Sequence, residues 1–401
     1  MASPARISLK TFLSTARKSL AAPSAQRPSP LTFVIGNESA DLDSICSAVL
    51  LAYFRTHTPP HTLHIPLSNL PRADLALRPE LTAILRPAGL SPDDFLTLSD
   101  FPKDGPRPDQ TQWLLVDHNA PTGFLANYLT TASPSESSPI IGCIDHHDDE
   151  GVVPASSDPR VFAKCGSCMS LVLDHVKPAW VALPPSREID SQLSYLALGP
   201  ILIDTTNLAS KDKTTEWDVR AVALAEANLQ GGGYDRTGYF DAISELKEDI
   251  SGLSFRDVLR KDYKRWADGG LVLGMSSVVQ GIEYLTTELG DRDGFLEALK
   301  SWSKEQGLDI AAVMTVSRPR GVFTRELLVW AFGEQGIRVA KQFVDKNKEA
   351  LGLEAWGKGG LDGEDGEQGG WRVCWTQRRV ESSRKQVAPM LREAMQDASK
   401  L

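Results

Sequence analysis

Carboxylate and imidazole side chains follow three short apolar segments of the chain. They are Asp41 and Asp43 after Leu31–Ile35, Asp117 after Trp113–Val116, and Asp145, His146 and His147 after Ile140–Ile144. A further acid, Asp204, lies near the end of the expected helix Ser191–Leu208. Each acid alone would also fit a helix N-cap or a solvated loop. A buried cluster of them needs cations nearby, and two divalent metal ions sharing a carboxylate could stabilise a phosphoryl displacement.

The segments that carry these residues alternate in character. The apolar runs are followed by amphipathic stretches, such as Asp43–Phe54 and Ser167–Val176. This alternation predicts βαβ units, and hence an α/β fold with a parallel sheet covered by helices. Ligands of such sheets bind beyond the carboxyl ends of the strands. We therefore expect the acids and imidazoles to converge on one crevice.

The chain divides into three expected parts. Residues 1–30 form an N-terminal helix and linker, 31–232 the metal-binding domain, and 233–401 a smaller α/β domain, with Gly231–Gly233 as the flexible boundary. The expected strands of the second domain are Leu271–Val279, Ile310–Val316 and Leu327–Phe332, and its helices lie near Gly294–Trp302 and Gly336–Lys348.

Composition limits the classes of partner. The 401 residues include 41% hydrophobic and 24% charged residues, which is typical of a globular protein. A net charge of −9 argues against binding to nucleic acid or an anionic membrane, so an anionic ligand must be bound by a local basic cluster. Five scattered cysteines fit reduced thiols in the cytoplasm. We expect a monomer.

The first 30 residues are basic and contain no acid, as in a mitochondrial targeting segment. We favour the simpler interpretation, an exposed first helix followed by a Pro/Ser linker, and a cytoplasmic protein.

Two basic clusters in the second half could bind phosphate. Each would ordinarily be a solvated face. An arginine fork with lysine point charges nevertheless suits a ligand with several phosphates. The clusters are Arg260, Lys261, Lys264 and Arg265, and Arg378, Arg379, Arg384 and Lys385.

Four local strings resemble, in order and spacing, the motifs of the DHH phosphoesterase superfamily. They are Gly36–Ser44 (GNESADLDS), Val116–Asn119 (VDHN), Ile144–His147 (IDHH) and Ile203–Asn207 (IDTTN). The resemblance is strongest to eukaryotic exopolyphosphatases, which share the superfamily with family II pyrophosphatases and prune proteins. The second half resembles the DHHA2 domain of this subgroup. The resemblance implies an active site in the cleft between the two domains.

The resemblance also implies residue roles. Asp41 would bind one metal ion, and Asp43, His146 and Asp204 the second, with Asp117 bridging both. His147 would face the nucleophile or the attacked phosphate, while Asp145 and His118 would orient other residues. The remaining implied phosphate contacts are Lys264, Arg384, Lys385 and Ser167.

The implied activity is removal of terminal orthophosphate from inorganic polyphosphate with two divalent ions, Mg²⁺ before Mn²⁺ or Co²⁺. The intact triplet Asp145–His147 supports an active hydrolase, since prune proteins differ at its second histidine. Family II pyrophosphatases have a histidine where this chain has Asn37, which favours polyphosphate and Mg²⁺. An inorganic pyrophosphatase, a prune-like nucleotide phosphodiesterase and a catalytically silent regulatory binding protein are the alternatives.

Overall fold

The computed structural model describes residues 6–102, 104–131, 138–229, 233–365 and 370–398. It consists of two compact units, Met1–Lys247 (unit 1) and Glu248–Leu401 (unit 2). The domain boundary expected between residues 232 and 233 stays a prediction. Gly231 and Gly232, expected to form a hinge, lie outside the described residues.

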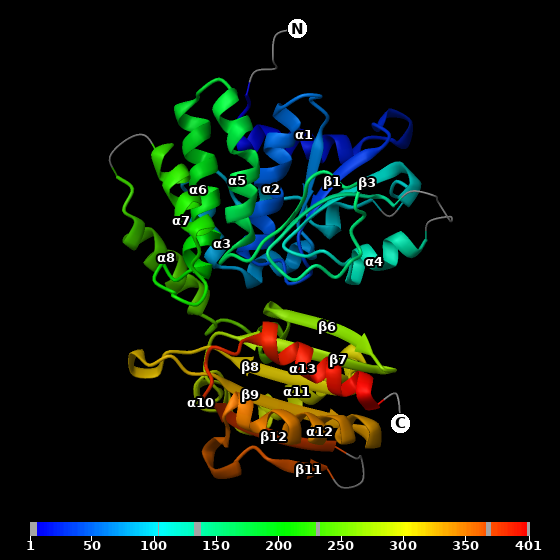
Figure 1. The fold of residues 1–401 in the computed structure, drawn as a ribbon, viewed down its shortest axis with the longest axis vertical. Coiled ribbons are helices and arrows are strands. Elements are labelled where there is room, and N and C mark those ends of the chain that lie inside the picture. The colour runs from blue at the N-terminus through cyan, green and yellow to red at the C-terminus, as the bar shows by residue number, and fades with distance from the viewer. Residues whose placement is uncertain (1–5, 103, 132–137, 230–232, 366–369, 399–401) are drawn as a thin grey trace. The chain divides into compact units, whose positions relative to one another are not determined.

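Unit 1 contains a parallel five-stranded sheet, which confirms the predicted fold class (Figure 1). Its strands are β1 (Leu31–Ile35), β2 (His64–Leu67), β3 (Thr111–Val116), β4 (Ile140–Asp145) and β5 (Arg160–Phe162), in the order β2-β1-β3-β4-β5. The central strands are apolar on both faces because helices and loops cover both sides. Phe33 and Trp113, which are register partners on β1 and β3, stack with ring centroids 4.6 Å apart.

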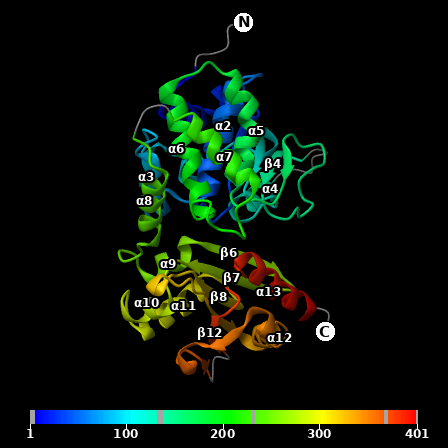
Figure 2. The ribbon, with the colours of Figure 1, turned by 60° about the vertical axis from the view of Figure 1, so that its left-hand side comes forward.

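The helices of unit 1 pack on this sheet and on one another. Helix α2 is buried along nearly its whole length, because α5, α6 and the sheet surround it (Figure 2). The α-helices are α1 (Leu9–Ala21), α2 (Leu42–His57), α3 (Glu80–Leu85), α4 (Gly123–Thr130), α5 (Cys168–Ala182), α6 (Arg187–Asp204), α7 (Glu216–Ala227) and α8 (Arg236–Glu248). The 3₁₀ helices are Ser24–Gln26, Arg72–Leu77, Pro92–Asp94, Leu98–Asp100 and Pro108–Gln110.

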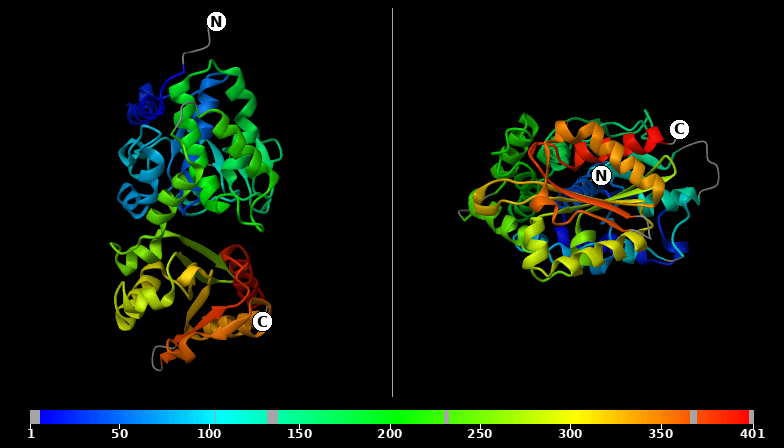
Figure 3. Two further views of the ribbon diagram at one scale, coloured as in Figure 1. Left: turned by 90° about the vertical axis from the view of Figure 1, so that its left-hand side faces the viewer. Right: turned by 90° about the horizontal axis from the view of Figure 1, so that it is seen from below.

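Helix α1 is part of the core of unit 1, so the expectation of an exposed first helix is wrong. One face of α1 is buried, including Phe12, whose ring lies edge-to-face with Tyr53 at 5.4 Å. Arg6, just before the helix, forms an ion pair of 2.7 Å with the buried Asp190 of α6. The left view of Figure 3 shows α1, in dark blue, on the flank of unit 1. The sequence alone did not show that α1 is buried, because the residues that pack on it lie far along the chain.

Unit 2 is a mixed sheet with a helical layer on each face. The right view of Figure 3 shows α12 and α13, in orange and red, on one face and the yellow helices on the other. The strands are β6 (Tyr263–Asp268), β7 (Leu271–Val278), β8 (Ile310–Thr315), β9 (Glu326–Phe332), β10 (Leu353–Ala355), β11 (Gly363–Asp365) and β12 (Gly370–Gln377). The helices are α9 (Phe255–Lys261), α10 (Ile282–Thr287), α11 (Arg292–Gln306), α12 (Gly333–Leu351) and α13 (Arg384–Ala398), with 3₁₀ helices Pro319–Gly321 and Trp356–Gly359. The predicted α/β character of this part is confirmed.

The five cysteines are free thiols, as their scattered positions predicted. No helix in the described part of the chain is long and apolar enough to cross a membrane.

The packing of α1 is testable by mutation. Phe12→Ala should lower the free energy of unfolding by about 3–5 kcal/mol, because the ring is fully buried and its removal leaves a cavity. Lys18→Ala, on the exposed face of the same helix, should change it by less than about 0.5 kcal/mol. Urea unfolding of both variants measures the difference. Equal stabilities would contradict the packing.

Candidate metal-binding active site

Three of the predicted site residues meet at the carboxyl edge of the unit 1 sheet. Asp117 directly follows β3, and Asp145 ends β4 just before His146 and His147. Neighbouring parallel strands end at the same edge, which brings these residues together. One ligand atom from each of Asp117, His146 and His147 lies within 4.8 Å of the other two. This group can hold a metal ion.

Asp117 adopts a left-handed backbone conformation, with φ of 60°, which is uncommon for a residue other than glycine. Its N–H donates to Ile144 O (3.1 Å), and its carbonyl accepts from Asn37 Nδ2 (3.1 Å). Its Oδ2 accepts from the same Asn37 nitrogen and from Ser44 Oγ, each at 2.7 Å. Since the amide of Asn37 donates to Asp117, Asn37 positions this carboxylate.

The two histidines are oriented by groups behind them. His146 Nδ1 lies 3.2 Å from Cys165 O, and because a carbonyl only accepts, this nitrogen carries the proton. The other ring nitrogen of His146, Nε2, faces Asp117 Oδ1, 3.2 Å away. Two lone pairs at this distance repel unless a proton or a metal ion lies between them. The donor geometry therefore fits a cation at this point.

His147 is supported by Asp145. The Nδ1 of His147 donates to Asp145 Oδ1 (2.7 Å), and its backbone N–H donates to the same oxygen (3.1 Å). Asn119 Nδ2 donates to the other oxygen (2.5 Å). Burial raises the pKa of Asp145, but the hydrogen bonds and the charge of His147 outweigh burial and leave the pKa below its usual value. Asp145 therefore stays ionised beneath His147.

Asp41 and Asp43 lie at the start of α2. Asp41 caps this helix by accepting from Ser44 N (3.0 Å). Asp43 is buried and accepts from the backbone N–H groups of Cys168 (2.6 Å) and Met169 (2.8 Å) at the start of α5. Asp43 also accepts from Ser47 Oγ (3.2 Å), and because a carboxylate offers about four lone pairs, it keeps capacity for a metal ion.

Asp204 ends α6 and belongs to the same electrostatic cluster. The pKa of Asp43 lies well above its usual value because of burial first, and then of repulsion by Asp117, Asp204 and Asp41. Burial also raises the pKa of Asp204. The four carboxylates predicted as metal ligands are thus close enough to repel one another.

The loop before α5 is held by a buried acid that the sequence analysis missed. Asp218 accepts from Gly166 N (2.9 Å), Ser167 N (3.3 Å), Ser170 Oγ (2.7 Å) and Thr215 N (2.7 Å). A Cβ on Gly166 would lie 2.5 Å from Thr205 Cγ2 and 3.2 Å from the carboxylate carbon of Asp218, so the close packing requires glycine. The loop also carries Cys165, whose carbonyl orients His146. Asp218 therefore sets the position of several site atoms.

Other residues around Asp204 also escaped the sequence analysis. The positive charges of Lys247 and Lys213 lower the pKa of Asp204 and partly oppose burial. The predicted phosphate contact Ser167 is fully buried, and its hydroxyl forms no hydrogen bond of normal geometry in the described part, although its proximity also lowers the pKa of Asp204. Asn119 is signalled in the sequence only by its place two residues after Asp117. The predicted orienting residue His118 contacts Val116 O at 2.9 Å.

The predicted phosphate-binding residues of unit 2 lie around the start of α13. Arg384 donates from Nη1 to Asp262 O (2.9 Å) and from Nη2 to Asp262 Oδ1 (2.7 Å). Lys385 is exposed in the first turn of α13, and its N–H donates to Ser383 Oγ (3.2 Å). Lys264 is half-buried on β6. Asp262 thus orients the guanidinium of Arg384.

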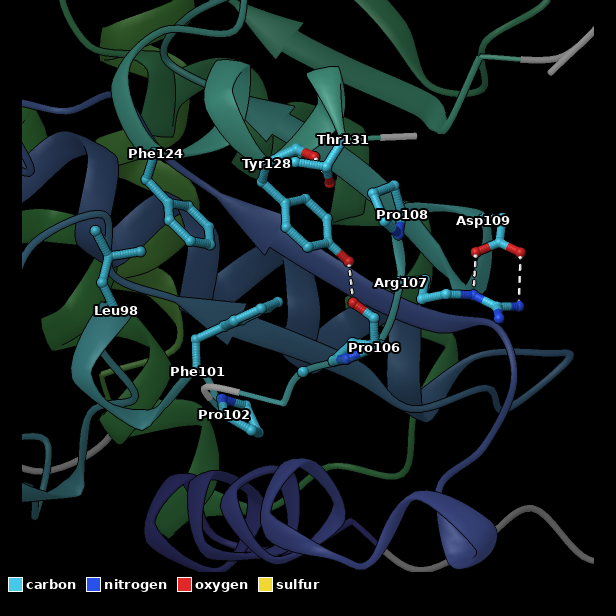
Figure 4. A pocket seen from close by; sticks show the side chains of 11 residues that line it. Leu98, Phe101, Pro102, Pro106, Arg107, Pro108, Asp109, Phe124, Tyr128 and Thr131 are labelled. Carbon is cyan, nitrogen blue, oxygen red and sulfur yellow. Dashed lines mark hydrogen bonds and ion pairs between the residues drawn. The ribbon is translucent and has the colours of Figure 1, made fainter. Parts of the chain in front are cut away.

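Unit 1 also contains a cavity of about 770 Å³ (Figure 4). Phe101, Phe124 and Tyr128 line it, with the hydroxyl of Tyr128 bonded to Pro106 O (2.6 Å). Its lining segment 106–109 precedes β3, whereas Asp117 follows that strand. No lining residue belongs to the predicted site.

Comparisons with known proteins agree with this arrangement. The model of the "DHH family, N-terminal domain" matches residues 32–199, and that of the "DHHA2 domain" matches 241–394. The chain is 35% identical over 374 residues to a Schizosaccharomyces pombe protein named "Putative exopolyphosphatase", with 92% of each chain covered. It is 28% identical to human "Exopolyphosphatase PRUNE1" over 73% of this chain and 61% of that protein. The crystal structure of a "putative family II inorganic pyrophosphatase" from Methanococcus jannaschii shares the fold, with a TM-score of 0.58 and 19% identity over 91% of this chain and 99% of that one.

The repulsion among the carboxylates predicts how stability depends on pH and metal. The folded pKa values of Asp43 and Asp204 exceed the usual 3.8, so folding retains protons that the unfolded chain releases. These two acids should therefore lower the unfolding free energy of chelator-treated protein as pH rises above about 4. Mg²⁺ or Mn²⁺ should restore stability at about pH 8 and have little effect near pH 4.5.

Urea unfolding with and without metal, at several pH values, measures this effect. Asp43→Asn should flatten the pH dependence in the metal-free protein, because a neutral amide replaces the titrating group. An equal effect of metal at both pH values would contradict the cluster.

Proposed function

Since the chain belongs to the DHH family, we propose that it is a metal-dependent exopolyphosphatase that removes terminal orthophosphate from inorganic polyphosphate. The observation that carries the proposal is the group Asp117, His146 and His147, set at one sheet edge with both imidazoles oriented from behind. The 35% identity to the Schizosaccharomyces pombe protein over 92% of the chain supports polyphosphate as the substrate.

Two divalent ions, Mg²⁺ before Mn²⁺ or Co²⁺, would be held by the unit 1 residues Asp41, Asp43, Asp117, His146 and Asp204. When bound, they would supply Lewis-acid stabilisation of phosphoryl oxygens and lower the pKa of a water molecule. Asn37 and Ser44 keep Asp117 in place for this role, since both donate to its Oδ2. Mutation of supporting residues of this kind typically lowers metal affinity or activity about 10–100-fold.

His147 would bind the attacked phosphate. Its Nδ1 proton is held by Asp145, whose lowered pKa keeps a negative charge beneath the ring. That charge favours the imidazolium form, which would donate to the phosphate as negative charge develops there. Asp145 therefore supports His147 in both its position and its protonation.

Arg384, Lys385 and Lys264 would bind phosphate oxygens. The guanidinium of Arg384 is already oriented by Asp262, which lowers the entropy cost of gripping a phosphate. With a net charge of −9, the chain depends on such local cations to attract a polyanion. Ser167 stays a proposed contact, supported by the position of its buried hydroxyl close to Asp204.

A phosphate-release assay tests the proposal. Long-chain polyphosphate, pyrophosphate and a cyclic nucleotide are compared with Mg²⁺, Mn²⁺ and Co²⁺. Release from polyphosphate should be fastest, one orthophosphate at a time. Faster release from pyrophosphate would identify a pyrophosphatase, cleavage of the nucleotide alone a phosphodiesterase, and no turnover a regulatory binding protein.

Asp117→Asn should reduce polyphosphate hydrolysis by at least about 100-fold, because the change removes the charge of a metal ligand. Loss of a residue that only supports a ligand already costs about 10–100-fold. Asp109→Asn, on an exposed acid before β3, is the control and should leave turnover unchanged. Steady-state phosphate release at saturating Mg²⁺ measures both variants. Normal turnover of Asp117→Asn would rule out the assigned site.

Arg384→Ala should lower kcat/KM for polyphosphate by roughly 10- to 150-fold, the loss of a charge-assisted contact of about 1.5–3 kcal/mol. Arg378→Ala is the control. It removes an exposed arginine of the same basic segment, which pairs with Glu354, and it should have little effect. If both variants behave alike, the basic segment is only a solvated face.

A further inference from the structure

Arg325 is a buried cation without a carboxylate partner. It precedes β9, and only 6% of its surface is exposed. The only hydrogen bond that its side chain forms with the described part of the chain runs from Nε to Val380 O (2.5 Å). Its guanidinium carbon lies 5.1 Å from the ring centroid of Phe323. Burial of a guanidinium is costly unless a negative charge compensates it.

The nearest acids in sequence do not pair with Arg325. Glu326 accepts from Ile282 N (2.6 Å) and Trp356 Nε1 (2.6 Å). Glu381 is exposed and forms no ion pair with the described residues. Burial alone lowers the pKa of Arg325, in keeping with the missing carboxylate. The charge of this guanidinium is therefore uncompensated within the described chain.

The terminal amino groups of Arg325 can reach a ligand. Neither Nη1 nor Nη2 forms a hydrogen bond within the described part, yet neither is closed off from solvent. A recessed guanidinium edge of this kind matches two oxygens of a phosphoryl group. Arg318 packs on the same Phe323 ring at 5.3 Å, and its pair with Glu248 is as long as 4.0 Å. Two like charges on one ring favour an anion between or beside them.

Arg325 also lies against the segment that leads to the proposed phosphate-binding residues. Val380 is four residues before Arg384, a span of at most about 14 Å. Gln377 holds the same segment, because its Nε2 donates to Arg379 O and Ser382 O (2.6 Å each) and its N–H donates to Arg325 O (2.9 Å). The two cationic positions are thus linked through one short, hydrogen-bonded stretch of unit 2.

We propose that Arg325, assisted by Arg318, forms a second phosphate subsite that binds an internal phosphate of a polyphosphate chain. The proposal rests on the proposed function, in which Arg384 and Lys385 bind the terminal part of the same chain. In this proposal a substrate of two or three phosphates occupies the position of Arg384 and Lys385 alone. The subsite would therefore favour long chains over short ones.

Kinetics on the full-length protein test the subsite. Arg325→Met should raise KM for long-chain polyphosphate by at least about tenfold, leave its kcat unchanged, and alter KM for tripolyphosphate by less than about twofold. Arg372→Met is the matched control, since Arg372 is also buried, donates from Nε to a carbonyl (Leu361 O, 2.7 Å) and stacks on Trp330. It should leave the ratio of the two KM values unchanged. An unchanged ratio in Arg325→Met would overturn the subsite.

A binding assay separates this inference from the proposed function. A chelator stops metal-dependent turnover, so binding can be measured alone. Under these conditions Arg325→Met should weaken binding of long-chain polyphosphate. It should also reduce the slope of the logarithm of the binding constant against the logarithm of the salt concentration by about one. If wild-type protein hydrolyses polyphosphate but the variant binds it normally, the subsite is wrong and the function stands. If the variant loses binding while wild-type protein hydrolyses no polyphosphate, the function is wrong and the subsite stands.

Two further arms complete the test. Orthophosphate should compete only weakly with the long chain for binding. If orthophosphate competes at least as strongly as tripolyphosphate, and this competition is lost in Arg325→Met, the site binds free phosphate instead. If Arg325→Met does not fold, Arg318→Met decides, because Arg318 is partly exposed. It should raise KM for the long chain in the same direction, by at least about twofold. No change would overturn the proposal.

Discussion

The repulsion among Asp41, Asp43, Asp117 and Asp204 is the constraint on which the site depends. Burial and the neighbouring carboxylates raise the pKa of Asp43, because the fold brings several acids together out of water. The pair of His146 Nε2 and Asp117 Oδ1, 3.2 Å apart, has the same deficit of positive charge. A folded chain tolerates such a cluster when a cation binds there, which is why the site fits divalent metal ions.

Neutral donors hold the cluster without neutralising it. The amide of Asn37 and the hydroxyl of Ser44 position Asp117, and backbone N–H groups at the start of α5 position Asp43. Asp218 in turn fixes the loop before α5 through several hydrogen bonds. Because these contacts use amides and hydroxyls, they orient the carboxylates while keeping their charge for a metal ion.

Unit 2 shows the complementary deficit. Arg384 shares its guanidinium with Asp262, whereas Arg325 is buried on Phe323 without an acid. In a chain with a net charge of −9, these cations are concentrated around one short segment, 377–385. Unit 1 thus has an excess of negative charge and unit 2 an excess of positive charge at their candidate sites. A polyphosphate with divalent cations would supply both.

The sequence by itself determined the parallel sheet of unit 1 and the placement of Asp117, Asp145 and the histidines at strand ends, because apolar runs and the residues that follow them are local in the chain. Only the tertiary structure decided that α1 joins the core, that Asn37 supports Asp117, and that Arg325 is buried beside Val380. Asp218 and Asn119 escaped notice for the same reason. Burial and hydrogen-bond partners arise between segments tens to hundreds of residues apart, and neither periodicity nor motif spacing encodes which segments meet.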